Sequence, residues 1–148
     1  MSKMKLLLTS IGKRVELIKH LKTQFEVLGA DCSDFNPARY FVDSFYKIPR
    51  ADKPEYLDSI LEICNKEKVN YVVPLYEGEF PVLSSSADKF SKLNTVLLLS
   101  DRKVIDICKD KYQTAYFFEF ICPVCFRVRH GFGSFFCGAW VKDRILIT

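Results

Sequence analysis

Short apolar runs alternate with longer amphipathic segments along the first 114 residues of the chain. Such runs, about four to eight residues long, are typical of strands that are buried on both faces of a sheet. We expect strands at residues 4–9, 25–32, 45–49, 70–75 and 95–99. Strands of this kind, separated by amphipathic helices, predict an α/β fold with a mostly parallel sheet covered by helices on both faces.

Four amphipathic segments between and after these runs predict helices, because their apolar residues recur at helical spacing. One of them covers residues 80–90. The apolar positions of the other three are Val15, Ile18 and Leu21; Leu57, Ile60, Leu61 and Cys64; and Val104, Ile105, Cys108 and Tyr112. The two cysteines on these stripes are expected to be small buried hydrophobic residues.

Two of the predicted helices also carry start signals. Asp52 is placed to cap one helix, with Pro54 in its first turn and Glu55 at the spacing of a capping box. Ser100 or Asp101 is placed to cap the last helix. These signals predict where both helices begin.

Polar residues follow three of the predicted strands, in the segments 10–14, 31–36 and 76–79. Ligands of parallel α/β sheets bind beyond the carboxyl ends of the strands, so we expect these segments to share one rim. The candidate substrate- or anion-binding residues on this rim are Ser10, Gly12, Lys13, Arg14, Asp31, Asp34, Glu77 and Glu79.

Each group of rim residues has a chemical role and a simpler alternative. A helix N-terminus at 10–14, with its two basic residues, suits a small anion or carboxylate. Glu77 and Glu79 suit the orientation of an amine or a metal, and otherwise are solvated loop acids. Asp31 and Asp34 otherwise support turns by accepting hydrogen bonds from nearby backbone. The sequence identifies no catalytic residue.

The turn after the first strand, TSIGKR, argues against two nucleotide sites. A dinucleotide fingerprint needs three glycines in this turn, and Gly12 is the single one there. A phosphate-binding loop needs a glycine where Leu7 stands and a Ser or Thr where Arg14 stands. The rim is therefore not predicted to hold a nucleotide through either motif.

The composition is that of one globular domain, or one domain with an appendage, at 148 residues and a net charge of +4. The lysines are spread between acidic residues, which indicates solvated helix faces and makes a nucleic-acid partner unexpected. The apolar run at the N-terminus is too short for a signal peptide, and no run has transmembrane length. Six cysteines without an export signal predict free thiols, a cytoplasmic location and no membrane partner.

Four segments taken together resemble a known family. They are KLLLTSIGKRVELIKHLK, GADCSDFNPARYFVDSFYKIPR, VNYVVPLYEGEFPVLS and LLSDRKVIDICKDKYQT. In this order, over roughly residues 4–118, they resemble the N-terminal part of ATP-grasp proteins, and especially the short proteins similar to the carbamoyl-phosphate synthase large subunit. The resemblance implies a Rossmann-like pre-ATP-grasp domain that forms the substrate side of the cleft, followed by an ATP-grasp domain that binds ATP and Mg²⁺.

The resemblance also implies a reaction. A carboxylate is activated by ATP as an acyl phosphate, which an amine or ammonia then attacks. The Asp110-Lys111 pair looks like the family motif at the entrance to the ATP-grasp domain, where the lysine reaches the nucleotide phosphates. The alternative for Lys111 is an ordinary exposed helix lysine.

The last 34 residues, 115–148, depart from the family and hold nine aromatic residues, three cysteines and three glycines. The resemblance implies a pre-ATP-grasp domain at 1–114, and the change of composition predicts an irregular tail at 115–148, as in a truncated or frame-shifted product. We expect such a chain to be inactive alone and to bind neither ATP nor Mg²⁺ tightly. Its expected partners are a small carboxylate, and either a separately encoded ATP-grasp domain or a second copy of the chain.

The tail also contains the pattern of a zinc site. Cys122, Cys125, His130 and Cys137 offer the ligand types that tetrahedral zinc takes, and Arg127 and Arg129 lie between them. This predicts an alternative function, a small zinc-containing module that binds nucleic acid. Against it, the last gap has six residues where a zinc knuckle has four, and chance in an aberrant tail also explains the pattern.

Overall fold

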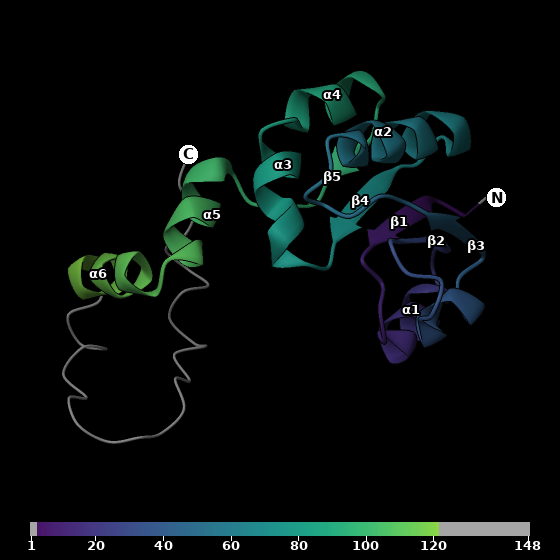
Figure 1. The fold of residues 1–148 in the computed structure, drawn as a ribbon, viewed down its shortest axis with the longest axis horizontal. Coiled ribbons are helices and arrows are strands. Elements are labelled where there is room, and N and C mark those ends of the chain that lie inside the picture. Colours follow the sequence, from purple (N-terminus) through teal and green to yellow (C-terminus); the bar gives the residue numbers. More distant parts are fainter. Residues whose placement is uncertain (1–2, 122–148) are drawn as a thin grey trace. The chain divides into compact units, whose positions relative to one another are not determined.

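A computed structural model of the chain describes residues 3–121, with side chains as far as Phe118 (Figure 1). The described residues divide after Ile105 into two compact units. The first unit holds a five-stranded sheet, and the second contains the end of one helix and the whole of another.

The sheet, which the sequence predicted to be mostly parallel, is parallel throughout. Its strands are β1 (Lys5–Thr9), β2 (Glu26–Asp31), β3 (Ser44–Lys47), β4 (Tyr71–Pro74) and β5 (Val96–Leu97), in the order β3-β2-β1-β4-β5. The central strand β1 aligns Leu7 with Leu28 of β2 and with Val72 of β4. The carboxyl ends of the strands therefore meet at one edge of the sheet.

Helices cover both faces of this sheet, which confirms the predicted α/β fold (Figure 1). Leu6 and Leu8 pack on one face with α1 (Val15–Leu21) and the 3₁₀ helix η1 (Pro37–Tyr40). Leu7 points to the other face, which is covered by α2 (Glu55–Glu67), α3 (Phe80–Ser84) and α4 (Ala87–Lys92). The alternation along β1 follows from the two-residue period of a strand.

The helix that follows the sheet, α5 (Arg102–Lys109), begins where the sequence predicted. The Asp101 carboxylate accepts the Val104 backbone N–H at 3.0 Å, which is the geometry of an N-cap. The next helix, α6 (Lys111–Ile121), follows directly, and Asp110 accepts the Tyr112 N–H at 2.7 Å. None of the helices in the described residues is long and apolar enough to cross a membrane.

The predicted cap of α2 is wrong. Asp52 makes no capping hydrogen bond, and its carboxylate instead lies 3.5 Å from Nε of Arg50. Pro54 occupies the capping position with helical backbone angles, and the Tyr56 N–H already bonds the Lys53 carbonyl. A turn of main-chain hydrogen bonds thus leads into the helix, so the first N–H groups do not need the Asp52 side chain.

The single helix predicted over residues 80–90 is two short helices, α3 and α4. Serines separate them, because their hydroxyls bond backward to helix carbonyls. Ser84 donates to the Pro81 carbonyl and Ser85 to the Val82 carbonyl. Side chains of this kind compete with the helical ladder, which explains the interruption.

The last strand and the last helix stripe are more exposed than predicted. β5 has only two paired residues and lies at the sheet edge, so Val96 and Leu98 are each 51% exposed. Ile105 of α5 is buried, whereas Cys108 of α5 is exposed. Tyr112 lies not on α5 but on α6, and it is exposed as well. Cys64 is buried as predicted, and burial raises the pKa of its thiol to about 12.

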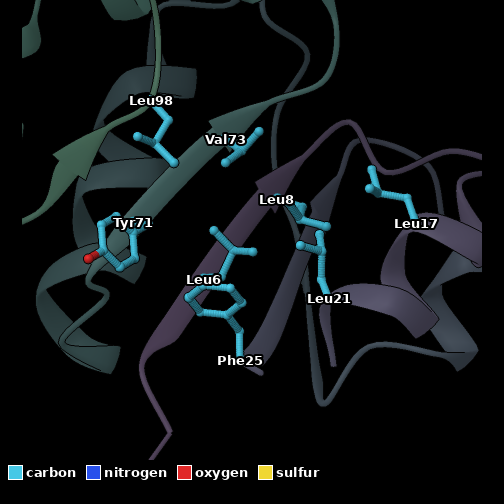
Figure 2. A pocket seen from close by; sticks show the side chains of 8 residues that line it. All are labelled: Leu6, Leu8, Leu17, Leu21, Phe25, Tyr71, Val73 and Leu98. Carbon is cyan, nitrogen blue, oxygen red and sulfur yellow. The ribbon is translucent and has the colours of Figure 1, made fainter. Parts of the chain in front are cut away.

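An apolar groove of about 270 Å³ runs over the α1 side of β1 and β4 (Figure 2). Its lining residues are Leu6, Leu8, Leu17, Leu21, Phe25, Tyr71, Val73 and Leu98. Leucines of α1 form one wall, and Tyr71 and Val73 of β4 form the other. No charged group lines it, so the groove lacks the polar groups that orient a charged substrate.

The edge of the sheet formed by the amino ends of the strands carries a small ion-pair network. Lys5 Nζ lies 3.0 Å from Glu67 and 3.6 Å from Glu26. The hydrogen bond from Lys5 holds the pKa of Glu67 below its ordinary value of 4.5. The folded protein therefore stabilises the charged form of this carboxylate.

We expect Glu67→Gln to lower the free energy of unfolding by about 1 kcal/mol at pH 7. A lowered folded pKa means that the stabilisation is complete above 4.5 and is lost as the pH falls through the folded value. The deficit of the variant should therefore disappear in acid. Urea unfolding at a series of pH values measures it, with Glu16→Gln in the exposed Lys19 pair as the control. A deficit that persists at pH 2 contradicts the assignment.

Candidate functional site

The structure brings together five of the predicted rim residues at the carboxyl edge of the sheet. They are Ser10, Gly12, Arg14, Asp31 and Glu79, and hydrogen bonds connect the turns after β1, β2 and β4 through them. Lys13 and Glu77 are exposed. Asp34 pairs with Lys47 and Arg39 instead.

Glu79 is the most deeply buried of these residues. It belongs to the short 3₁₀ helix η2 (Glu77–Glu79) after β4 and is 1% exposed. Its Oε2 accepts the Thr9 hydroxyl at 2.6 Å, and its Oε1 accepts the Ser10 hydroxyl. A buried carboxylate with two hydroxyl donors is not the solvated loop acid that one interpretation expected.

Two members of this buried cluster were not predicted, namely Thr9 and Tyr56. Tyr56 of α2 lies on the face of the sheet that α2, α3 and α4 cover. Its hydroxyl has no hydrogen-bond partner among the described residues. Burial, and then the charge of Glu79, raise the pKa of the Tyr56 hydroxyl. The only signal in the sequence was the polar Thr9 that ends an otherwise apolar run.

Asp31 joins the turns after β1 and β2. Its side chain is 7% exposed, and its two oxygens accept the Gly12 N–H at 3.0 Å and the Ser33 N–H at 2.9 Å. The turn after β2 continues to Asn36, which caps η1 by accepting the Arg39 N–H. Asp31 therefore supports backbone in both turns, the role that the simpler interpretation gave it.

Arg14 joins the turns after β1 and β4. Its guanidinium donates to the Ser10 carbonyl at 3.0 Å and to the Leu75 carbonyl at 2.7 Å. The hydroxyl of Ser10 and the N–H of Gly12 are also engaged within the protein. Of the groups predicted to bind an anion, the ammonium of Lys13 and the remaining N–H groups of Arg14 are left facing solvent.

The other predicted ligands come later in the sequence, at residue 111 and beyond. Lys111 is exposed and is the first residue of α6 in the second unit. No group of three or more metal-ligating side chains occurs within the part of the chain that the structure describes. Cys122, Cys125, His130 and Cys137 lie outside the described residues.

We expect Thr9→Val to lower the free energy of unfolding by about 2 kcal/mol, because the variant keeps the side-chain shape and loses a bond to a carboxylate. Tyr56→Phe is the matched control. It also removes a buried hydroxyl, but one without a partner, so it should change stability by less than about 0.5 kcal/mol. Chemical denaturation of the two variants measures the difference. Equal losses would show that Tyr56 bonds Glu79 as Thr9 does.

Solved structures share this fold at low sequence identity. Glycinamide-RNase-transformylase T from Mycobacterium tuberculosis matches 81% of this chain with a TM-score of 0.58 and 13% identity. N5-carboxyaminoimidazole synthetase from Staphylococcus aureus, solved with ADP, matches 81% with a TM-score of 0.57 and 12% identity. The biotin carboxylase domain of 2-oxoglutarate carboxylase from Hydrogenobacter thermophilus matches 81% with a TM-score of 0.57 and 16% identity.

The chain spans only part of these neighbours. It covers 35% of the transformylase, 31% of the synthetase and 28% of the biotin carboxylase domain. Among curated proteins, none matches the sequence significantly.

A family profile covers the region that carries the rim. The profile described as the PylC-like N-terminal domain matches residues 6–98, which is more than half of the chain. This range runs from β1 to β5 and includes the turns that hold Ser10, Asp31 and Glu79. The chain therefore belongs to the family of PylC-like N-terminal domains, which have the pre-ATP-grasp fold found at the N-terminus of ATP-grasp enzymes.

Proposed function

We propose that this chain provides the substrate-side domain of an ATP-dependent ligase that joins a carboxylate to an amine or to ammonia. The observation that carries the proposal is the set of hydrogen bonds made by Thr9, Ser10, Asp31 and Glu79, which ties three strand-end turns of a pre-ATP-grasp domain into one surface. Parallel α/β sheets bind ligands at this edge. The exposed Lys13 is the charge that this surface offers to a carboxylate.

The reaction class is that of the family resemblance. A carboxylate oxygen attacks the γ-phosphorus of ATP and ADP leaves; the nitrogen of the amine then attacks the acyl carbon and phosphate leaves. The solved neighbours support nucleotide chemistry of this kind, since one was solved with ADP and another with MgADP and bicarbonate. A substrate pair of bicarbonate and ammonia would make this chain carbamoyl-phosphate-synthase-like.

The proposal assigns nucleotide binding to residues outside the rim. Lys111 is exposed at the start of α6, where a mobile point charge suits contact with phosphates. We assign the remaining ATP and Mg²⁺ ligands to an ATP-grasp domain, because the chain spans about a third or less of its neighbours. The chain alone should not turn over ATP. No observation on the described residues favours the zinc-containing alternative.

A titration of the full 148-residue chain, followed by two-dimensional amide NMR, tests the proposal. Bicarbonate, acetate and glycine are the probes. We expect amide shifts to cluster at residues 10–14 and 76–79, and to weaken in Lys13→Met but not in Lys89→Met, a control at an exposed lysine of α4. Absent or scattered shifts would overturn the proposal. ADP formation by the chain alone with MgATP would contradict the inactivity assigned to it.

A further inference from the structure

The turn after β1 adopts a backbone conformation that its sequence alone does not favour. Ser10 has φ of 51° and Gly12 has φ of 51°, both in the left-handed region. Glycine enters this region without penalty, whereas serine does so at a cost. A non-glycine residue in this region persists where the surrounding structure holds it, and such residues cluster at ligand sites.

Three side-chain contacts hold residues 10–12 of this turn, and the most buried of them comes from Glu79. Glu79 accepts the Ser10 hydroxyl across a sequence separation of 69 residues, and its second oxygen accepts the hydroxyl of the preceding residue, Thr9. Arg14 donates to the Ser10 carbonyl, and Asp31 accepts the Gly12 N–H. The first contact fixes the strained residue itself, from a carboxylate that is 1% exposed.

Glu79 cannot meet a ligand directly while it is buried in this way. Its effect on the rim must pass through the turn, whose next residue is the exposed Lys13. Its neighbour Glu77, two residues earlier on the same 3₁₀ helix, is exposed. The pair therefore consists of a buried acid that shapes the turn and an exposed acid.

We propose that Glu79 is a positioning residue, which holds the turn 10–12 in its left-handed conformation and thereby sets the place of Lys13 on the rim. This inference rests on the proposed function for the identity of the ligand, but not for the behaviour of the turn. If Glu79 had only a structural role, it would stabilise the whole fold, and no substitution of Ser10 would compensate for its loss. A positioning residue becomes dispensable once the turn prefers the conformation by itself.

The test compares Glu79→Gln, Ser10→Ala, Ser10→Gly and the double variant of Glu79→Gln with Ser10→Gly in the full chain. Hydrogen exchange of the amides of residues 11–13, followed by NMR, reports the turn, and the amides of β1 and β2 report the fold. Glu79→Gln should accelerate exchange in the turn by about tenfold and leave the central strands unchanged. Ser10→Ala should do the same while the Thr9 bond to Glu79 remains, so the test survives even if Glu79→Gln folds poorly.

The double variant gives the decisive result. Because glycine adopts the left-handed conformation freely, exchange in the turn should return to about the rate of Ser10→Gly alone, while the melting temperature stays lowered. In the same spectra, bicarbonate should bind about tenfold more weakly to Glu79→Gln and regain affinity in the double variant. Glu77→Gln should leave the exchange of the turn amides at the wild-type rate.

Two results overturn the inference: turn amides that keep wild-type exchange in both Glu79→Gln and Ser10→Ala, or a double variant whose turn exchanges as fast as Glu79→Gln. These outcomes need no ligand, so they leave the proposed function standing. Conversely, a wild-type chain that binds none of the carboxylate probes overturns the proposed function, while the exchange rates still decide whether Glu79 positions the turn.

Discussion

Replacing Asp31 with alanine should lower the free energy of unfolding by about 4 kcal/mol. The Asp31 carboxyl is 7% exposed and accepts two backbone N–H groups, from Gly12 and Ser33. Its removal leaves both donors without this acceptor inside the protein, and each hydrogen bond to a charged group contributes about 1.5–3 kcal/mol. The loss should also loosen the turns after β1 and β2 together, because this side chain accepts backbone N–H groups from both of them.

Asp34 offers a matched control three residues away. It pairs with Lys47 and Arg39, but its side chain is 39% exposed, so Asp34→Ala should destabilise the protein much less than Asp31→Ala. Urea unfolding of the two variants gives the comparison. Added salt should weaken the small effect of Asp34 and leave that of Asp31 nearly unchanged. Similar losses in the two variants would show that Asp31 is not the junction of the two turns.

The sequence predicted the sheet well because burial on both faces leaves a strong pattern. The centres of β1, β2 and β4 are apolar, and Pro74 ends β4 as expected. The prediction weakened where exposure, and not residue type, decided the structure. Val96 and Leu98 are apolar like core residues, but they lie at a sheet edge. The sequence of one strand does not show where in the sheet that strand lies.

The position of the rim could be predicted from the sequence, but the structural role of each rim residue could not. Glu77 and Glu79 are the same residue type, two positions apart. A 3₁₀ helix has three residues per turn, so it points them in different directions, and only Glu79 enters the core. Gly78 between them has the ring of Tyr76 against it, since an added Cβ would lie 2.4 Å from Cε1 of that ring.

The predicted anion site is only partly available, because residues that are distant in the sequence occupy its donors. The residue types at 10–14 suited an anion, but Asp31, Glu79 and the Leu75 carbonyl take most of the donors. These partners come from later strand ends and join the turn only when the sheet is assembled. Charge patterns near one strand cannot show which donors a distant strand will occupy.

A loss of stability as large as that of Asp31→Ala is expected at Phe90. Its side chain is fully buried in the cluster that also holds Leu83, Tyr56 and Ile60. It anchors α4, which has six residues and is too short to be stable without packing. Phe90→Ala should lower the free energy of unfolding by about 4 kcal/mol, as removal of a buried aromatic ring leaves a cavity.

The loss of stability in Phe90→Ala should also differ from one part of the chain to another. The backbone N–H groups of Leu93 and Thr95 both bond the Phe90 carbonyl, so α4 leads directly into β5. In Phe90→Ala, the amides of α4 and β5 should therefore exchange faster than those of β1 and β2. Phe35→Ala, at a ring that is 99% exposed, is the control and should change neither stability nor exchange. A uniform rise in exchange over the whole sheet would instead mean that α4, β5 and the central strands unfold as one unit, and that the edge depends on Phe90 no more than the centre does.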